Sequence, residues 1–171
     1  MSLGEYLGAG AATTKLLLHL NGNSNDSSGN GNNGTDTNIT YSKNYGKFNE
    51  GANFNGSTSK IVTGNCNYGI RFTVSIWVKP DNVTQKDYAR LVESNYSTGF
   101  SINYYTSSGA NTIYATVKGV GNWIIGNISI TPNVWQNIIL IYNGSNISVY
   151  KNGILGYSQI STTDPTLTNA P

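Results

Sequence analysis

The acidic side chains of this sequence are too scattered to form the carboxylate pair on which glycoside hydrolysis depends. A glycosidase places two carboxyl groups on either side of the bond that it cleaves. We expect such a pair to come from acids that share one strand face, and no two acids here do so. The acids are Glu5, Asp26, Asp36, Glu50, Asp81, Asp87, Glu93 and Asp164.

The single histidine and the single cysteine offer no better base or nucleophile. His19 lies between leucines of a predicted strand, where a packed or edge position is the commoner role, and Cys66 has no second thiol and no evident histidine partner. No phosphate-binding loop, nucleophile-elbow motif or zinc spacing is present. We therefore expect no enzymatic activity.

Residues 21–34 form a glycine- and asparagine-rich stretch that could hold a cation. Asp26 and Asn30, with nearby carbonyl groups, supply the hard oxygen ligands that Ca²⁺ prefers, although the spacing is not that of an EF-hand. The alternative is a loop in which these side chains bond to their own backbone. Calcium is the one cofactor that the sequence suggests.

Aromatic residues beside amides give a second kind of candidate site. Tyr96, Tyr104, Tyr105 and Trp123 could stack on sugar rings, and Asn103 could bond to sugar hydroxyl groups. The alternative is that these side chains supply surface polarity or an interface.

Composition excludes two classes of partner. The 171 residues carry a net charge of +2 with 11% charged residues, and the Lys and Arg residues form no stripe, so we expect no nucleic-acid binding. The longest apolar runs have the length of a strand, so we expect no membrane insertion.

Short strands are predicted throughout the chain, separated by turn residues. Residues 72–79 are the clearest case, with Phe72, Val74, Ile76 and Val78 facing one way. Asn143–Asn146 and Asn152–Gly153 predict two hairpins, the second with a type I′ turn. No helical periodicity is present, so the strands must pair as an all-β sandwich or barrel. The other predicted strands are residues 15–20, 52–54, 60–62, 89–93, 100–105, 113–118, 123–130, 135–142, 147–151 and 155–160, with residues 21–37 as a loop.

Four segments together resemble one known family. They read LLLHLNGNSNDSSGNGNNG from Leu16, FNEGANFNGSTSKI from Phe48, FTVSIWVKPD from Phe72 and WQNIILIYNGSNISVYKNG from Trp135. In this order they resemble the laminin-G-like (pentraxin-related) branch of the concanavalin A-like lectin/glucanase superfamily. The resemblance implies a two-sheet antiparallel jelly-roll sandwich over residues 14–161, between an N-terminal Gly/Ala-rich arm (1–13) and a C-terminal tail (162–171).

The resemblance also implies particular residue roles and reveals one departure. Trp77 and Trp135 fall within the family's strand motifs, so it implies that both belong to the core. The acidic strand that usually ends such domains has no counterpart in residues 163–171. A truncation, a partner's strand or the N-terminal arm could account for this.

Family members are commonly non-catalytic modules of secreted glycosidases, adhesins and bacteriophage virion proteins, and many of them bind glycans. No signal peptide is evident, and the surface composition is polar but uncharged. We therefore expect a virion decoration, fibre or tail-surface protein, outside the cell or on the virion surface. It would contact virion proteins, itself or a cell-surface glycan, with the arm as its docking segment. The alternative is a carbohydrate-binding module from a secreted glycosidase or adhesin.

Overall fold

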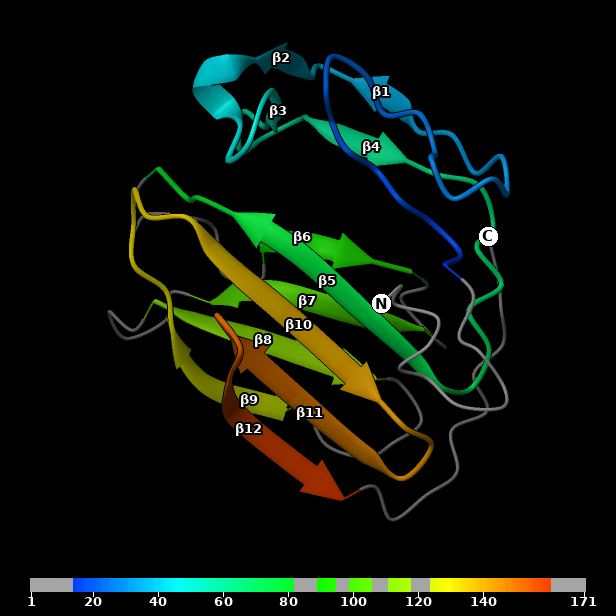
Figure 1. Ribbon diagram of the computed structural model, residues 1–171. Coiled ribbons are helices and arrows are strands. Elements are labelled where there is room, and N and C mark those ends of the chain that lie inside the picture. The colour runs from blue at the N-terminus through cyan, green and yellow to red at the C-terminus, as the bar shows by residue number, and fades with distance from the viewer. Residues whose placement is uncertain (1–13, 82–88, 95–98, 106–110, 118–123, 161–171) are drawn as a thin grey trace. The chain divides into compact units, whose positions relative to one another are not determined.

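The computed structural model describes residues 14–81, 89–94, 99–105, 111–117 and 124–160. Contacts divide the chain into two compact units, residues 1–67 and 68–171. Twelve strands and one 3₁₀ turn make up the regular structure of the described residues, which confirms the predicted all-β class (Figure 1). None of the described residues forms a helix with the length and apolar character needed to cross a membrane.

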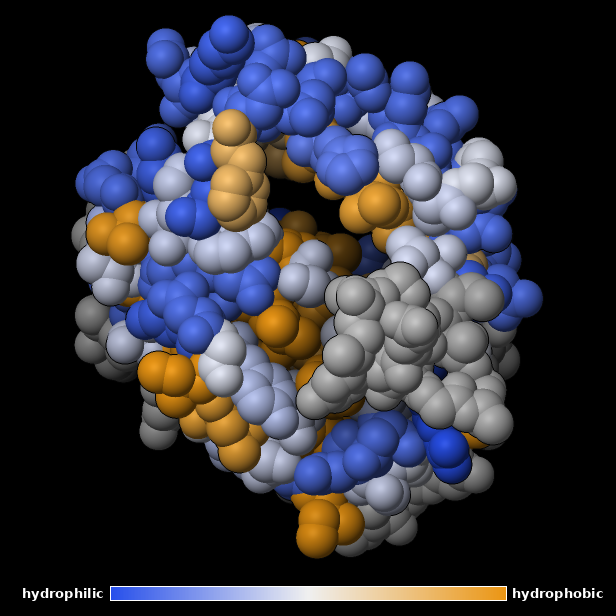
Figure 2. Space-filling model, viewed as in Figure 1, coloured by the Kyte–Doolittle hydropathy of each residue, from blue (hydrophilic) through white to orange (hydrophobic). Residues whose placement is uncertain are grey.

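The first unit contains two small antiparallel sheets. β1 (Thr35–Thr37) pairs with β4 (Lys60–Val62), and β2 (Thr40–Ser42) pairs with β3 (Gly51–Asn53). A 3₁₀ turn, Lys43–Tyr45, joins β2 to the segment that leads into β3. Figure 2 shows a mostly hydrophilic surface over these strands, in keeping with their Asn-, Ser- and Thr-rich sequence.

The second unit is a sandwich of two four-stranded antiparallel sheets. One has the order β12-β11-β10-β5 and the other the order β6-β7-β8-β9. The strands are β5 (Phe72–Val78), β6 (Ala89–Glu93), β7 (Phe100–Tyr105), β8 (Thr112–Val117), β9 (Ile124–Ser129), β10 (Gln136–Tyr142), β11 (Asn146–Lys151) and β12 (Ile154–Ile160).

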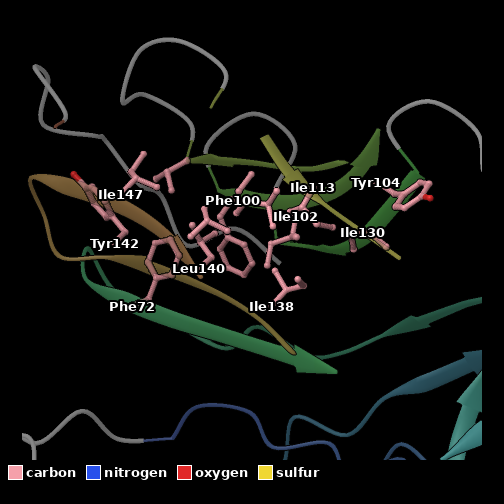
Figure 3. Close-up of a cluster of buried hydrophobic side chains, with 14 residues drawn as sticks. Phe72, Phe100, Ile102, Tyr104, Ile113, Ile130, Ile138, Leu140, Tyr142 and Ile147 are labelled. Atoms are coloured by element: carbon pink, nitrogen blue, oxygen red, sulfur yellow. The ribbon is translucent and has the colours of Figure 1, made fainter. Parts of the chain in front are cut away.

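The core lies between these two sheets. Phe72, Ile138 and Leu140 come from one sheet and Ile102 and Ile113 from the other, and all five are at most 9% exposed (Figure 3). They occupy alternate strand positions because successive side chains of a strand point to opposite faces. The predicted inward face of β5 is confirmed, since Val74, Ile76 and Val78 pack against the same cluster.

Aromatic rings pack at one end of this core. Phe72 and Phe100 have ring centroids 4.9 Å apart, and Tyr68 meets each of them edge-on at 5.1 and 5.3 Å. The Tyr68 hydroxyl group reaches Ser94 Oγ at 2.9 Å, so its polar end is satisfied. The contact connects the segment before β5 to the end of β6.

Both predicted hairpins are confirmed. Tyr142 pairs with Ile147 across a turn in which Asn143 Oδ1 accepts the backbone N–H groups of Ser145 and Asn146. Asn152 and Gly153 have φ values of 51° and 81°, as a type I′ turn requires. β12 follows this turn as an edge strand with exposed apolar residues, and Figure 2 shows hydrophobic surface near its position.

Two local predictions were wrong. Residues 15–20 form only an isolated bridge, Leu18 with Asp26, because loop side chains bind the backbone of this segment. Residues 21–37 are not all loop, since β1 begins at Thr35 and pairs with β4. Threonine favours strands, and the pairing partner lies beyond the reach of a local pattern.

Candidate functional site

The outer face of the β6–β9 sheet is polar and yet buried. Ser101 and Asn103 on β7 and Thr116 on β8 point away from the apolar core, and they are 6%, 3% and 4% exposed. Both strands are therefore buried on both faces over most of their length. Burying polar groups costs free energy unless each finds a hydrogen-bond partner.

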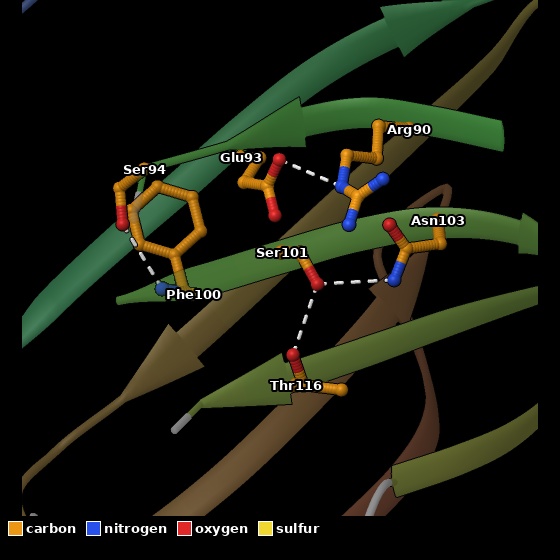
Figure 4. A network of polar contacts seen from close by, with 7 residues as sticks. All are labelled: Arg90, Glu93, Ser94, Phe100, Ser101, Asn103 and Thr116. Carbon is orange, nitrogen blue, oxygen red and sulfur yellow. Dashed lines mark hydrogen bonds and ion pairs between the residues drawn. The ribbon is translucent and has the colours of Figure 1, made fainter. Parts of the chain in front are cut away.

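These three side chains form a hydrogen-bonded chain across β7 and β8. The Asn103 amide Nδ2 donates to Ser101 Oγ at 3.0 Å, and Ser101 Oγ lies 2.9 Å from Thr116 Oγ1 (Figure 4). The geometry follows from the register, because Ser101 and Thr116 are directly paired while Ser101 and Asn103 are two positions apart on β7. We call Asn103, Ser101 and Thr116 the polar triad.

The triad leaves one acceptor without a partner. Asn103 Oδ1 is buried and accepts no hydrogen bond from the described residues. A buried polar atom in this state costs about 1–3 kcal/mol, and proteins seldom leave one without a reason. Asn103 Oδ1 is therefore the one acceptor of the polar triad that the described residues leave unsatisfied.

An ion pair lies beside the triad at the more exposed margin of this face. Arg90 Nε is 2.6 Å from Glu93 Oε2, and the two side chains are 46% and 25% exposed. Arg90 pairs with Asn103 and Glu93 with Ser101 in the β6–β7 ladder, with a register shift between them. The bulge brings both charged side chains to the same face as the triad (Figure 4).

Two tyrosines lie further along the same face. The rings of Tyr105 and Tyr114 have centroids 5.9 Å apart at an interplanar angle of 46°. Tyr114 is 5% exposed and Tyr105 is half-buried. We call the polar triad together with Arg90, Glu93 and Tyr105 the outer-face site.

The structure brings together two of the five predicted glycan residues. Asn103 and Tyr105 share the outer face, because they are two positions apart on β7. Tyr104 points the other way, is 1% exposed and donates its hydroxyl proton to Asn111 Oδ1 at 3.1 Å. Its expected place on a ligand face is corrected, since Tyr104 is a core residue. Tyr96 and Trp123 lie outside the described residues.

Sequence reasoning overlooked the other members of the site. Ser101 and Thr116 are small polar residues in strands that also contain Ile102 and Ile113, and nothing in composition marks them as special. The available signal was the period-2 alternation of Phe100–Tyr105, which places Ser101, Asn103 and Tyr105 on one face.

Asp26 organises its loop through four hydrogen bonds that its carboxylate accepts. Its carboxylate accepts from the backbone N–H groups of Leu17, Ser28 and Asn32 at 2.9–3.0 Å and from the Ser28 hydroxyl group at 2.8 Å. Desolvation would raise the pKa of Asp26, but the hydrogen bonds from Ser28, Leu17 and Asn32 outweigh it and lower the pKa to about 2.

Asn30 completes the same loop instead of adding an oxygen ligand. Its Nδ2 group donates to the carbonyl oxygen of Thr14 at 2.8 Å and to Ser28 Oγ at 2.9 Å. These bonds fit the self-bonded loop that was the alternative to calcium, because a cation would have to displace N–H donors from Asp26. Calcium binding here stays a prediction. Within the described part of the chain, no group of three or more His, Cys, Asp or Glu side chains could hold a metal ion.

The resemblance assigns Trp77 and Trp135 to the core, but neither side chain is fully buried. Trp77 points outward from β5 and is 44% exposed, so its core assignment was wrong. Trp135 is half-buried just before β10, with Lys79 Nζ 5.8 Å from its ring centroid. The alternation of β5 puts Trp77 on the face opposite to Ile76, as the strand pattern itself indicates.

The sequence and the fold define the family. Residues 55–171 match the laminin-G family that is described as the concanavalin A-like lectin/glucanases superfamily, and the chain belongs to it. The sandwich of two antiparallel sheets agrees with the jelly-roll fold expected of this family. No curated protein matches the sequence.

Two solved structures share this fold. One is domain 4 of AbnA, a GH43 extracellular arabinanase from Geobacillus stearothermophilus, in complex with arabinotriose: TM-score 0.60, 23% identity, 86% of this chain and 75% of that chain covered. The other is the binding domain of Paraclostridial Mosquitocidal Protein 1: TM-score 0.67, 21% identity, 86% of this chain and 40% of that chain covered. Identities this low establish a common fold only.

Proposed function

We propose that this chain is a non-catalytic glycan-binding module and that the outer-face site binds the sugar. The observation that carries the proposal is the accessible margin of the outer-face site, where the Arg90 and Glu93 side chains are 46% and 25% exposed and Tyr105 is half-buried. Sugar hydroxyl groups can donate to a carboxylate and accept from a guanidinium group, and the C–H groups of a sugar can pack on an aromatic ring. Domain 4 of the arabinanase, which has the same fold and is in complex with arabinotriose, supports the class of ligand, and the binding domain of the mosquitocidal protein supports a binding role.

A binding role without catalysis fits the chemistry of the site. The β6–β9 strands contain only one acidic residue, Glu93, and its carboxylate is held by Arg90. Glycoside hydrolysis by the usual route needs two carboxyl groups about 5–10 Å apart, so a lone, ion-paired glutamate is insufficient.

A glycan array followed by calorimetry tests this proposal. The intact chain should bind at least one class of oligosaccharide, and the same sugar should raise its melting temperature, because a ligand that binds only the folded state stabilises it. Heat-denatured protein serves as the control. If no neutral, acidic or cell-wall-derived glycan binds, the proposal is wrong.

The setting of the module is part of the proposal. We place it at an extracellular or virion surface, where cell-surface and cell-wall glycans are accessible. The narrower role predicted from the sequence, a bacteriophage decoration, fibre or tail-surface protein, stays a prediction, as does self-association, because the arm assigned to docking (1–13) lies outside the described residues. Co-sedimentation of the chain with virions would test that role.

A further inference from the structure

β5 is an edge strand without the usual protection of an edge. It ends its four-stranded sheet, and β10 is the one described strand that pairs with it (Figure 1). None of its seven residues, Phe72–Val78, is charged or a proline, and the pairing with β10 shows no register shift. Edge strands usually carry lysine, proline or a bulge, because their backbone groups otherwise attract another strand. The sequence of β5 is therefore that of a strand from the interior of a sheet.

Backbone groups of β5 point to the open edge at every second residue. Asn137 of β10 uses its own N–H and C=O groups with the residue that follows β11. Because these directions alternate along a strand, the groups of Ile138 point the other way, to its pairing partner Ile76. By the same alternation, the N–H and C=O groups of Thr73 and Ser75 point away from β10.

The core is less completely buried along β5 than along its neighbour. Val74, Ile76 and Val78 face the core from β5 but are only half-buried, whereas Ile138 and Leu140 of β10 are 0% exposed. The apolar residues of β6, the edge strand of the other sheet, pack against the core and are half-buried too. This side of the sandwich is therefore open at both sheets.

The opposite side of the sandwich is closed, because β9 and β12 approach each other closely there. A Cβ atom on Gly156 would lie 2.5 Å from Ile128 Cγ1, and Lys151 Nζ donates to the carbonyl oxygen of Ser129 at 2.6 Å. A strand added beside β5 would give the open side the cover that β9 and β12 give each other.

Two cations define the charge of a matching strand. Arg71 and Lys79 lie just outside the two ends of β5, and both are exposed, as is every second residue between them. They therefore belong to the outer face of the sheet. Opposite charges on neighbouring strands stabilise their pairing, so acidic residues at the ends of an added strand would be favourable.

A second copy of β5 fits this edge poorly. Antiparallel pairing centred on Ser75 is the register that joins all seven residues of both copies. It would place Arg71 of each copy opposite Lys79 of the other, and like charges opposite each other destabilise a sheet. The charges therefore favour a different, acidic strand.

We propose that the edge of β5 binds an extended segment of a partner protein by strand addition. The segment has apolar residues at alternate positions, which cover the half-buried side chains of β5, and acidic residues near Arg71 and Lys79. Main-chain hydrogen bonds provide affinity, while the apolar positions and the charges provide specificity. This interaction is independent of glycan binding, because β5 and the outer-face site belong to different sheets.

Synthetic peptides, capped at both termini, test the proposal on the intact chain. The probe is DVTVTVTVE, in which valine alternates with polar residues and both ends are acidic. One control is KVTVTVTVK, and the other is DVTVPVTVE, in which proline removes the central N–H group. By titration calorimetry we expect the probe to bind, the basic peptide to bind roughly three- to tenfold more weakly, and the proline peptide not to bind.

Amide hydrogen exchange locates the binding. The N–H groups of Thr73 and Ser75 should exchange at least about tenfold more slowly with the probe peptide bound, because they become part of a ladder. The N–H group of Ile76 faces β10 and serves as the internal reference.

The variant Arg71→Glu tests the charge. It should weaken binding of DVTVTVTVE and strengthen binding of KVTVTVTVK, each by about threefold or more. A merely structural role of Arg71 would weaken both peptides alike. Lys60→Glu is the matched control, since Lys60 is exposed on β4 and the change in charge is the same. It should leave both affinities unchanged.

Three outcomes would overturn the proposal. The first is that the probe peptide does not bind, and the second is that it protects amide groups elsewhere but not those of Thr73 and Ser75. The third is that the chain alone self-associates and protects these two groups, which would make a second copy the occupant of the edge. None of these results bears on glycan binding, and a negative glycan array leaves strand addition untouched.

Discussion

Charge balance at the outer-face site depends on a single residue. Glu93 neutralises Arg90, and both side chains are partly exposed, so the pair contributes only about 0–1 kcal/mol to stability. We expect its effect on ligand choice to be larger than its effect on folding, because replacing Glu93 with a neutral residue changes the net charge of the site.

Glu93→Gln should therefore change specificity more than stability. Because this variant gives the site a net positive charge, we expect measurable binding of polygalacturonate that weakens steeply between about 50 and 500 mM NaCl, as screened charges do. Affinity for neutral sugars should change less than threefold. Calorimetry at the two salt concentrations provides the measurement. If the variant does not bind polygalacturonate, the ion pair does not control the binding of acidic glycans.

Asp26 makes the first unit sensitive to acid. Its pKa is about 2 in the folded chain and 3.8 when unperturbed, so the unfolded state binds the proton more tightly. The contribution of Asp26 to stability is therefore present above pH 3.8 and is lost as the pH falls towards 2.

Amide chemical shifts of Ser28 and Asn32 should report this titration directly, because both N–H groups donate to Asp26. We expect them to move together between pH 3.8 and about 2. Asp26→Asn is the reference and should lack that transition. The same acid profile in both proteins would show that another group is responsible.

Among the structural elements, the β2–β3 hairpin requires glycine at position 51, because the backbone of Tyr45 lies close against it. Gly51 opens β3, and a Cβ atom at this position would collide with the carbonyl oxygen of Tyr45. Backbone cannot move aside as the end of a flexible side chain can, so the hairpin of β2 and β3 depends on glycine here.

Gly51→Ala should destabilise the first unit by about 1–3 kcal/mol, the usual cost of forcing atoms into a packed site. Gly153→Asn is the control, because a Cβ at Gly153 meets nothing within 4 Å and asparagine tolerates its φ of 81°. Urea denaturation followed by tyrosine fluorescence compares the two. Equal stability of Gly51→Ala and wild type would contradict the steric account.

In the whole molecule, uncharged polar residues take the place that charged residues have in most proteins. Charged residues make up 11% of the chain, and the net charge is +2. Long-range electrostatics can therefore contribute little to the stability of the folded state, which depends on apolar burial between the two sheets of the second unit.

We expect the melting temperature to change by no more than about 2 °C between 50 and 500 mM NaCl at neutral pH, since few charges are available to screen. Binding of a neutral glycan should be equally insensitive to salt. Differential scanning calorimetry and sugar titration at both concentrations check this. A strong salt dependence would indicate charge interactions that the composition does not suggest.

The sequence by itself determined the elements of the second unit. The alternation in residues 72–78 and the turn chemistry of Asn152–Gly153 are local, and local sterics fix both. The motifs from Phe48 onward identified the family that residues 55–171 match. Local pattern failed at residues 15–20, where partners such as Asp26 and Asn32 compete for the backbone from 9 to 17 residues away.

Only the tertiary structure decided which aromatic and polar residues form a site. Tyr104 and Tyr105 are neighbours of the same type, yet one packs in the core and the other lies on the outer face. Trp77 gives a second example. The family motif implied that it lies in the core, but its position in β5 leaves it 44% exposed. The physical reason is that burial depends on what covers each face of a sheet. Pairing of β7 with β6 and β8 places Arg90 opposite Asn103 and Thr116 opposite Ser101.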